Sequence, residues 1–331
     1  MIMKSAPSVK YEIIRQATEN DNNLLNLTWL CQMAGVSRSG YYYWLESETN
    51  RAKKETDDER DFALIVEAYQ FRGYDKGVRG LHMRLLHLNP PVVINPKKIR
   101  RLMHKYGLVC PIRKANPYRR MAKALQTNRI AQNILNREFK AHKERSVLLT
   151  DITYIRREVD KFTYVVVIMD AFTKEILSYV VSPSLDVDFV LSAVEQLAEK
   201  HGHELKTNCL IHSDQGCHYT SHKFVDLIAN KNLRQSMSRK ANCWDNAPQE
   251  SFWGHMKDHL RLNPSDNNSR ITHKVNDWMD YYNNDRGQWK LAKLTPAEYY
   301  QYVTTGVYPL AIKPPTTDQI KSNKGDDEYD N

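Results

Sequence analysis

The chain has 331 residues, of which 41% are hydrophobic and 26% charged, enough for two or three domains with a sizeable core. Gly (12) and Pro (13) are too few for a low-complexity or collagen-like chain, and no apolar stretch is long enough for a membrane span. The five cysteines form no C-x-x-C pair, which argues against a disulfide framework or a structural zinc site and favours the reduced thiols of a cytoplasmic protein.

The formal net charge of +9 is concentrated in one part of the chain. The window 97–145 holds fifteen Lys or Arg and only two acidic residues, so the rest of the chain is slightly acidic. Such a window predicts a polyanionic partner, most often nucleic acid. A solvated basic face explains an isolated run about as well.

Residues 1–50 are predicted to form an N-terminal helical unit. Apolar residues recur there at helical spacing, at Leu27, Leu30, Cys31 and Ala34. Gly35 is a helix stop signal, and Ser37 can start a second helix. The pattern resembles a helix-turn-helix, with a plain helical hairpin as an equal alternative. Residues 46–61 are charged and are predicted to link this unit to the next.

Residues 57–109 are predicted to form three helices of a DNA-binding unit that resembles a helix-turn-helix. In the last helix, Asn95 and Pro96 give a start signal and Gly107 a stop signal. Its apolar face consists of Ile99, Leu102, Met103 and Tyr106. The opposite face carries the candidate DNA contacts Lys97, Lys98, Arg100, Arg101 and Lys105.

Residues 110–145 are basic and poorly periodic, which predicts a linker arm that follows a phosphate backbone. Its candidate DNA contacts are Arg113, Lys114, Arg119 and Arg120.

Residues 146–262 change to a mixed pattern. Strands are predicted at 147–155, 162–170 and 175–181, joined by short connections in an antiparallel meander. Helices and strands then alternate, at 186–200, 208–213, 221–230, 233–237 and 247–260. This order is typical of a ribonuclease H-like domain with a five-stranded mixed sheet. The fold class is therefore multidomain, α followed by α/β, with a C-terminal helical extension at 263–310 and a disordered tail at 311–331.

Three carboxylates lie at positions where they could form an active site together. Asp151 lies within an apolar strand, where burial of a carboxylate is costly without compensation. Asp214 ends the fourth strand, and Glu250 lies one turn into the last helix of the core. In the predicted topology the first and fourth strands are neighbours, so the three side chains converge.

Converging carboxylates raise each other's pKa unless a cation compensates them. Oxygen ligands suit Mg²⁺ or Mn²⁺, and two such ions form the usual clamp for phosphoryl transfer. Lys257 lies seven residues after Glu250 on the same helix face and is a candidate DNA-phosphate contact. His212 and Asn246 are possible active-site support, although a packed strand histidine is at least as plausible for His212.

The spacing of Asp214, thirty-five intervening residues and Glu250 resembles the D,D(35)E core of retroviral integrases and bacterial transposases. The strings His-Ser-Asp-Gln-Gly at 212–216 and Trp-Asp-Asn-Ala at 244–247 are more specific. They resemble the OrfB-type transposases of the IS-three family of bacterial insertion sequences. The strings Asp-Ile-Thr-Tyr at 151–154 and Tyr-Tyr-Asn-Asn at 281–284 fit the same family, and the resemblance covers roughly residues 25–300.

The resemblance implies an activity and its partners. The three carboxylates would hold two Mg²⁺ or Mn²⁺ ions and catalyse metal-dependent DNA cleavage and strand transfer at terminal inverted repeats. The partners would be double-stranded DNA, as ends and as target, and further copies of the chain in at least a dimer. The protein would be cytoplasmic and associated with the nucleoid when bound to DNA. Family members commonly carry an upstream helix-turn-helix and leucine zipper, whereas no sustained heptad occurs here.

Two other functions remain open from the sequence. A ribonuclease H-like nuclease that only hydrolyses DNA would share the carboxylates, but would not need two basic helical units. A non-catalytic DNA-binding regulator would not need an intact set of three carboxylates.

Overall fold

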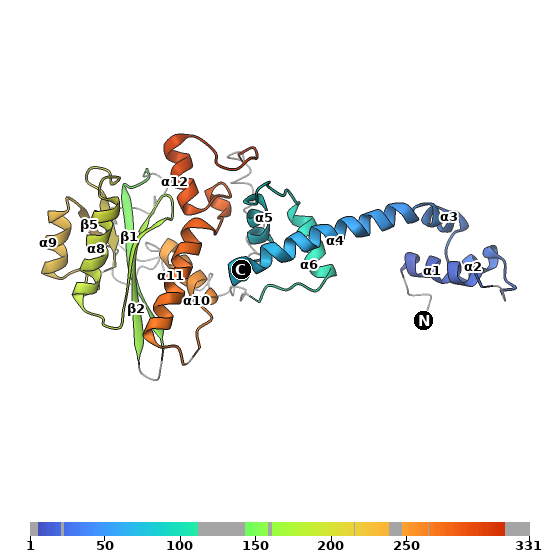
Figure 1. Cartoon of the computed structure of the whole chain (residues 1–331), viewed down its shortest axis with the longest axis horizontal. Helices are drawn as coiled ribbons and strands as arrows, with labels where there is room; N and C mark the ends of the chain where they lie inside the picture. Colours follow the sequence, from blue (N-terminus) through green and yellow to red (C-terminus); the bar gives the residue numbers. More distant parts are fainter. Residues whose placement is uncertain are drawn as a thin grey trace, which may run out of the picture. The chain divides into compact units, whose positions relative to one another are not determined.

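The computed structural model describes residues 6–20, 23–111, 143–157, 161–214, 216–237, 247–263 and 265–314. It divides the chain into two compact units, Met1–Leu64 and Ile65–Asn331 (Figure 1). Within the described ranges, no helix has both the length and the apolar character needed to cross a membrane.

The first unit contains three short helices, α1 (Pro7–Thr18), α2 (Leu27–Ala34) and α3 (Arg38–Glu46). The side chain of Asn26 caps α2, and Ser37 caps α3 by accepting from the Gly40 amide. Gly35 ends α2 in the left-handed region, at φ 64°, where glycine has no steric penalty. A small core is formed by Ile14, Cys31, Ala34 and Tyr41. The predicted helix, glycine turn and serine-capped helix are therefore present.

The charged residues predicted to link the two units are helical: Glu46 ends α3, and the residues from Glu48 onward belong to a long helix, α4 (Glu48–Gln70). No Gly or Pro interrupts this segment, and its charged residues are good helix formers. Opposite charges one turn apart support the helix, as in the ion pair between Arg60 and Asp57 at 3.2 Å. The polar composition of this segment is therefore that of a solvated helix.

Two further helices in the second unit follow a short 3₁₀ turn, η2 (Phe71–Gly73): α5 (Val78–Leu86) and α6 (Pro96–Lys105). Asn95 caps α6, and Gly107 follows it with φ 70°. The inner face of α6 is fully buried at Ile99 and Leu102. The predicted amphipathic helix is therefore present.

A five-stranded mixed sheet forms the centre of the second unit, as predicted. Its strands are β1 (Val147–Arg156), β2 (Phe162–Asp170), β3 (Ile176–Ser182), β4 (Leu210–Ser213) and β5 (Arg234–Met237). The spatial order is β3-β2-β1-β4-β5. The first three strands form an antiparallel meander, whereas β1 and β4, and β4 and β5, are parallel. The strands that carry Asp151 and lead to Asp214 are therefore direct neighbours.

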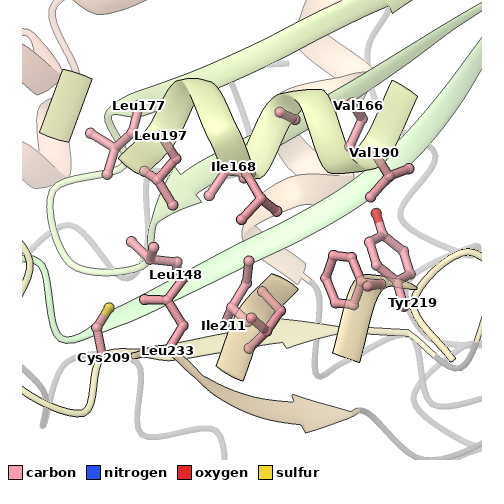
Figure 2. Close-up of a cluster of buried hydrophobic side chains, with 14 of the residues drawn as sticks. Leu148, Val166, Ile168, Leu177, Val190, Leu197, Cys209, Ile211, Tyr219 and Leu233 are labelled. Atoms are coloured by element: carbon pink, nitrogen blue, oxygen red, sulfur yellow. The ribbon is translucent and has the colours of Figure 1, made fainter. Parts of the chain in front are cut away.

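Helices cover both faces of the sheet (Figure 1). One face packs against α8 (Val187–His201) and α9 (His222–Asn230), the other against α10 (Ala247–His259) and α11 (Asn268–Asn284). Figure 2 shows the first core, where Leu148, Val166 and Ile168 of the strands lie against Val190 and Leu197 of α8. The second core joins β2 to the aromatic residues of α10 and α11. Because β2 is buried on both faces, its sequence is a continuous apolar run.

The predicted C-terminal extension is an integral part of this packing. Val275 and Trp278 of α11 are fully buried in the second core. After the 3₁₀ turn η4 (Trp289–Leu291), α12 (Pro296–Thr305) begins with a capping box formed by Thr295 and Glu298. Residues 315–331 of the predicted tail lie outside the described residues.

The end of the predicted basic arm belongs to the core. Most of the arm, residues 112–142, lies outside the described residues. Arg145, however, is 1% exposed and forms ion pairs with Asp170, Glu175 and Glu204 at 3.2, 2.8 and 3.0 Å. Its guanidinium also lies 3.8 Å from the centroid of the Tyr300 ring. Three carboxylates that are distant in sequence but adjacent in space therefore hold this positive charge inside the domain, where it is not available to DNA.

Candidate active site

Asp151 lies midway along β1, on the sheet face that is covered by α10. The partly buried carboxylate accepts two hydrogen bonds, from the Trp253 indole N–H at 3.0 Å and from the Ile152 amide at 2.9 Å. The preceding residue, Thr150, points to the other face and contacts the Tyr219 hydroxyl at 3.2 Å. Strand alternation thus places Asp151 on the same side of the sheet as Glu250.

Asp214 follows β4 directly and is exposed. One of its carboxylate oxygens accepts from the Gly216 amide at 2.9 Å. A side chain at residue 216 would be crowded, because a Cβ there would lie 2.9 Å from the same oxygen. The glycine therefore lets the loop turn back over the Asp214 carboxylate.

Glu250 lies in the first turn of α10, a helix that packs against β1. Trp253, three residues further along α10, is 6% exposed and provides the bond to Asp151. Trp253 is a site residue that no sequence motif described above includes. Its position one turn after Glu250 would have been the signal, because residues i and i+3 share a helix face.

Asp214 and Glu250 lie within electrostatic reach of Asp151. Burial raises the pKa of Asp151 to about 6, against the opposing hydrogen bonds from Trp253 and Ile152. The negative charges of Asp214 and Glu250 raise this pKa further. The fold therefore brings together the carboxylates that lie ninety-nine residues apart along the chain.

The carboxylates do not form a closed metal cage. Among the residues that the structure describes, which do not include 215 or 238–246, no three His, Cys, Asp or Glu side chains lie close enough together to hold a metal ion. The site is open on the side of Asp214 and Glu250, which are both exposed.

Of the two candidate supporting residues, His212 and Asn246, the structure describes only His212. His212 is fully buried in β4, two residues before Asp214, and its Nδ1 bonds the Ser236 hydroxyl of β5 at 3.0 Å. This bond joins neighbouring strands, and a role in supporting the active site remains a prediction. Asn246 lies outside the described residues.

Lys257 is the basic side chain on α10 whose charge is coupled to Asp151. Partial burial lowers the pKa of Lys257, and the Asp151 carboxylate raises it. The side chain is exposed, so a bound phosphate could reach it.

The other candidate DNA contacts divide into two groups. Those of α6 lie on its outward face, where Lys97, Arg100, Arg101 and Lys105 are exposed and Lys98 is half-buried. Those of the arm, Arg113, Lys114, Arg119 and Arg120, lie outside the described residues. Contact of either group with DNA remains a prediction.

Three family models match the chain. Two are described as integrase core domains and match residues 141–243 and 231–296. The third is described as an HTH-like domain and matches residues 56–116. The integrase models therefore cover the sheet and the helices that carry the three carboxylates.

Known relatives match most of the chain. The putative transposase InsK of insertion sequence element IS150, from Escherichia coli K12, is 31% identical over 273 residues, which are 82% of this chain and 92% of the relative. An uncharacterized 31 kDa protein of insertion element IS600 from Shigella sonnei is 28% identical over 82% of this chain and 97% of the relative. The transposase InsF of insertion sequence IS3A, also from Escherichia coli K12, is 25% identical over 69% and 77% of the two chains.

Among solved structures, the integrase catalytic core domain of HTLV-2 in complex with magnesium aligns with a TM-score of 0.37 and 15% identity, over 47% of this chain and 95% of that one. The 31% identity to InsK over 82% of this chain, together with the matches to an integrase core and an HTH-like domain, shows that the chain is related to these transposases. The chain belongs to the OrfB-type transposases of the IS-three family, polynucleotidyl transferases that act in DNA transposition and integration.

Proposed function

We propose that this transposase catalyses metal-dependent DNA cleavage and strand transfer at the terminal inverted repeats of an insertion sequence, with Asp151, Asp214 and Glu250 as its catalytic carboxylates. The observation that carries the proposal is the arrangement of the elements that bear these carboxylates: β1 pairs directly with β4, and α10 packs against β1 with Trp253 bonded to Asp151. The negative charges of Asp214 and Glu250 make ionisation of Asp151 less favourable when no cation is bound.

The residues fit a divalent cation in charge and in donor chemistry. All three side chains offer carboxylate oxygens, the ligands that Mg²⁺ and Mn²⁺ prefer. A cation would offset the burial and the repulsion that together raise the pKa of Asp151. Asp151, Asp214 and Glu250 would hold the ions. A bound pair of such ions supplies activation of the attacking oxygen and charge neutralisation at the leaving oxygen.

The remaining groups orient these carboxylates and the substrate. Trp253 holds one oxygen of Asp151, and the Gly216 amide holds one oxygen of Asp214. The Trp253 bond favours the ionised form of Asp151, and each bond fixes the direction of its carboxylate. Lys257 is positioned to receive a DNA phosphate on the exposed side of α10. The exposed basic face of α6 would hold the terminal repeat through its phosphates.

Transposition acts on both ends of one element, so one copy of the chain would bind each end. We therefore propose that the chain acts as a homo-oligomer, at least a dimer, on double-stranded DNA.

The test combines one substitution with two assays. Asp214→Asn keeps the size of the side chain but removes its charge, so it should abolish cleavage of end DNA in Mg²⁺ and leave end binding nearly unchanged. The matched control is Asp226→Asn on α9, a surface carboxylate of the same domain. If Asp214→Asn still cut DNA, the proposed site would be wrong.

Pre-cleaved end DNA separates strand transfer from hydrolysis. The wild-type protein should join such an end to a target duplex. Hydrolysis without any joined product would instead support the nuclease, and binding without either reaction would support the DNA-binding regulator.

A further inference from the structure

The outer end of the β1–β2 hairpin has one packed face and one exposed face. β4 pairs with β1 only at residues 147–149, and β3 pairs with β2 no further than Tyr164. The last paired residues of β1 and β2 therefore form a two-stranded ribbon. On its inner face, Ile155 is 2% exposed, and the fully buried Thr163 donates from its hydroxyl to Asn268 at 2.7 Å.

The opposite face carries three aromatic rings and one guanidinium. Tyr154 pairs directly with Tyr164, and Arg156 with Phe162, so these four side chains form a square on one face of the ribbon. We call it the aromatic ribbon face. The Tyr154 and Phe162 ring centroids are 6.2 Å apart, and those of Phe162 and Tyr164 are 6.5 Å apart.

Two of these rings are open to solvent, whereas Tyr164 is half-buried against the first core. Tyr154 is 63% exposed and Phe162 37%. An antiparallel ribbon that packs on one face normally presents polar side chains on the other. Cross-strand ring contacts account for some stability of the hairpin, but they do not require that the outward ring surfaces remain uncovered. Contiguous exposed aromatic surface is a common feature of binding sites.

We propose that the aromatic ribbon face binds unpaired nucleotides of the DNA substrate, with bases stacked on Tyr154 and Phe162 and a phosphate held by Arg156. The inference rests on the proposed function, because cleavage and joining of DNA ends expose bases that have lost their partners. Exposed rings beside a cation are the usual means of binding single strands without sequence preference. Arg156 and Lys161, both exposed, supply positive charge next to the rings.

The position of the face fits an accessory role. Tyr154 follows Asp151 by three residues on the same strand, roughly 10 Å along it. Because side chains alternate, Asp151 faces α10 and Tyr154 lies on the other side of the sheet. The aromatic ribbon face would therefore hold a separated strand near the carboxylates, without touching the reacting phosphate.

The experiment compares two DNA probes on the full-length protein. One is a fluorescent oligothymidine of about 12 nucleotides, a length within the range that stacking surfaces bind. The other is a blunt duplex of mixed sequence. Tyr154→Leu and Phe162→Leu should each weaken oligothymidine binding roughly tenfold, whereas duplex binding should stay within about twofold of wild type, because phosphate contacts dominate it. Tyr154→Phe and Phe162→Tyr should retain oligothymidine binding.

Two controls support the comparison. Phe172→Leu removes a ring from a contact with Tyr299, at 6.0 Å between centroids, elsewhere in the same unit; it should leave oligothymidine binding unchanged. Arg156→Gln removes a charge without removing apolar surface, so it remains informative if a leucine variant fails to fold. It should weaken oligothymidine binding and reduce the steepness of its logarithmic salt dependence by about 0.7.

Four results bear on the inference. Folded leucine variants that bind oligothymidine like wild type would overturn it, as would an Arg156→Gln variant with unchanged affinity and salt dependence. Loss of self-association in the leucine variants, measured by sedimentation with DNA binding intact, would show that a second copy covers the face and would also overturn it. Ring-dependent oligothymidine binding by a wild-type protein that neither cuts nor joins end DNA would support the stacking site and overturn only the proposed function.

Discussion

Trp253 donates its indole N–H to the Asp151 carboxylate at 3.0 Å, and so ties the helix that carries Glu250 to the strand that carries Asp151. The indole ring is buried in the core beneath α10, next to Phe252 and Met256. Packing of the helix and orientation of the carboxylate therefore depend on the same side chain.

Trp253→Phe should preserve most of the packing but remove the hydrogen bond. We expect cleavage activity to fall by about 10- to 100-fold, which is the usual effect of removing a group that orients a metal-binding side chain. In the metal-free protein the pKa of Asp151 should rise above its value of about 6, because the lost bond favoured the ionised form. Cleavage kinetics and a carboxyl NMR titration measure the two effects.

Trp278→Phe is the matched control for this substitution. Trp278 is also a fully buried tryptophan of the second core, and among the described residues its indole N–H has no hydrogen-bond partner. It should therefore lose packing but retain cleavage activity. Equal activity of Trp253→Phe and wild type would show that the Asp151 bond has no part in the reaction.

The basic face of α6 should contact DNA phosphates. Arg100→Gln combined with Arg101→Gln should weaken end binding and lower the slope of log affinity against log salt by about 1.8, roughly 0.9 for each lost contact. Both side chains are exposed, so stability should change little. Fluorescence anisotropy at several salt concentrations measures the slope. Lys231→Gln, an exposed lysine after α9, is the control, and an unchanged slope in the double variant would exclude α6 from the phosphate contact.

His87 and Glu298 should make the stability of the second unit depend on pH. His87 Nε2 lies 2.8 Å from the Glu298 carboxylate, and Nδ1 lies 2.7 Å from the Met83 carbonyl. Both neighbours are acceptors, so the ring satisfies both only when it is protonated. Burial lowers the pKa of His87, but the hydrogen bond and charge of Glu298 raise it above its ordinary value of 6.5. Burial raises the pKa of Glu298, but His87 and the Thr295 amide lower it below 4.5.

The pH dependence of the free energy of unfolding follows from these two pKa shifts. The raised pKa of His87 contributes stability that is complete below pH 6.5 and is lost as the pH rises through the folded value. The lowered pKa of Glu298 contributes stability above pH 4.5 that is lost as the pH falls through the folded value. His87→Gln should therefore lower the free energy of unfolding by about 1 to 3 kcal/mol at about pH 5.5 and by less at about pH 9. Urea unfolding at the two pH values measures this difference, and an equal loss at both would contradict an ionised pair.

Arg145 should be important for the stability of the catalytic unit. Arg145→Met leaves Asp170, Glu175 and Glu204 without their shared cation, at a cost of roughly 3 to 5 kcal/mol for a broken buried ion pair. The control is Lys206→Met, whose partner is Glu144 and whose side chain is 50% exposed; its loss should cost at most about 1 kcal/mol. Urea unfolding measures both, and a similar small effect of the two substitutions would show that the Arg145 cluster contributes little.

The sequence was sufficient to predict the strands and most helices of the catalytic unit. The apolar runs of β1 and β2 and the capping residues Asn95 and Asp186 mark local preferences, which the fold preserves. At residues 46–61 the sequence did not predict the helical form of the link, because a polar composition is compatible with both an irregular linker and a solvated helix. It also failed at Arg145, because composition does not distinguish a basic residue that faces DNA from one that pairs with carboxylates distant in the chain.

The sequence by itself determined the family and the candidate carboxylates, because Asp151, Asp214 and Glu250 stand in motifs with characteristic spacing. Only the tertiary structure decided how their charges act on one another, since a pKa depends on burial and on neighbours brought together by the fold. The same holds for the Trp253 bond to Asp151 and for the exposed rings of Tyr154 and Phe162. The local sequence pattern specifies which helix or strand forms. Tertiary packing specifies which side chains meet and which remain open to a ligand, through the pairing of β1 with β2 and β4 and the packing of α10 on β1.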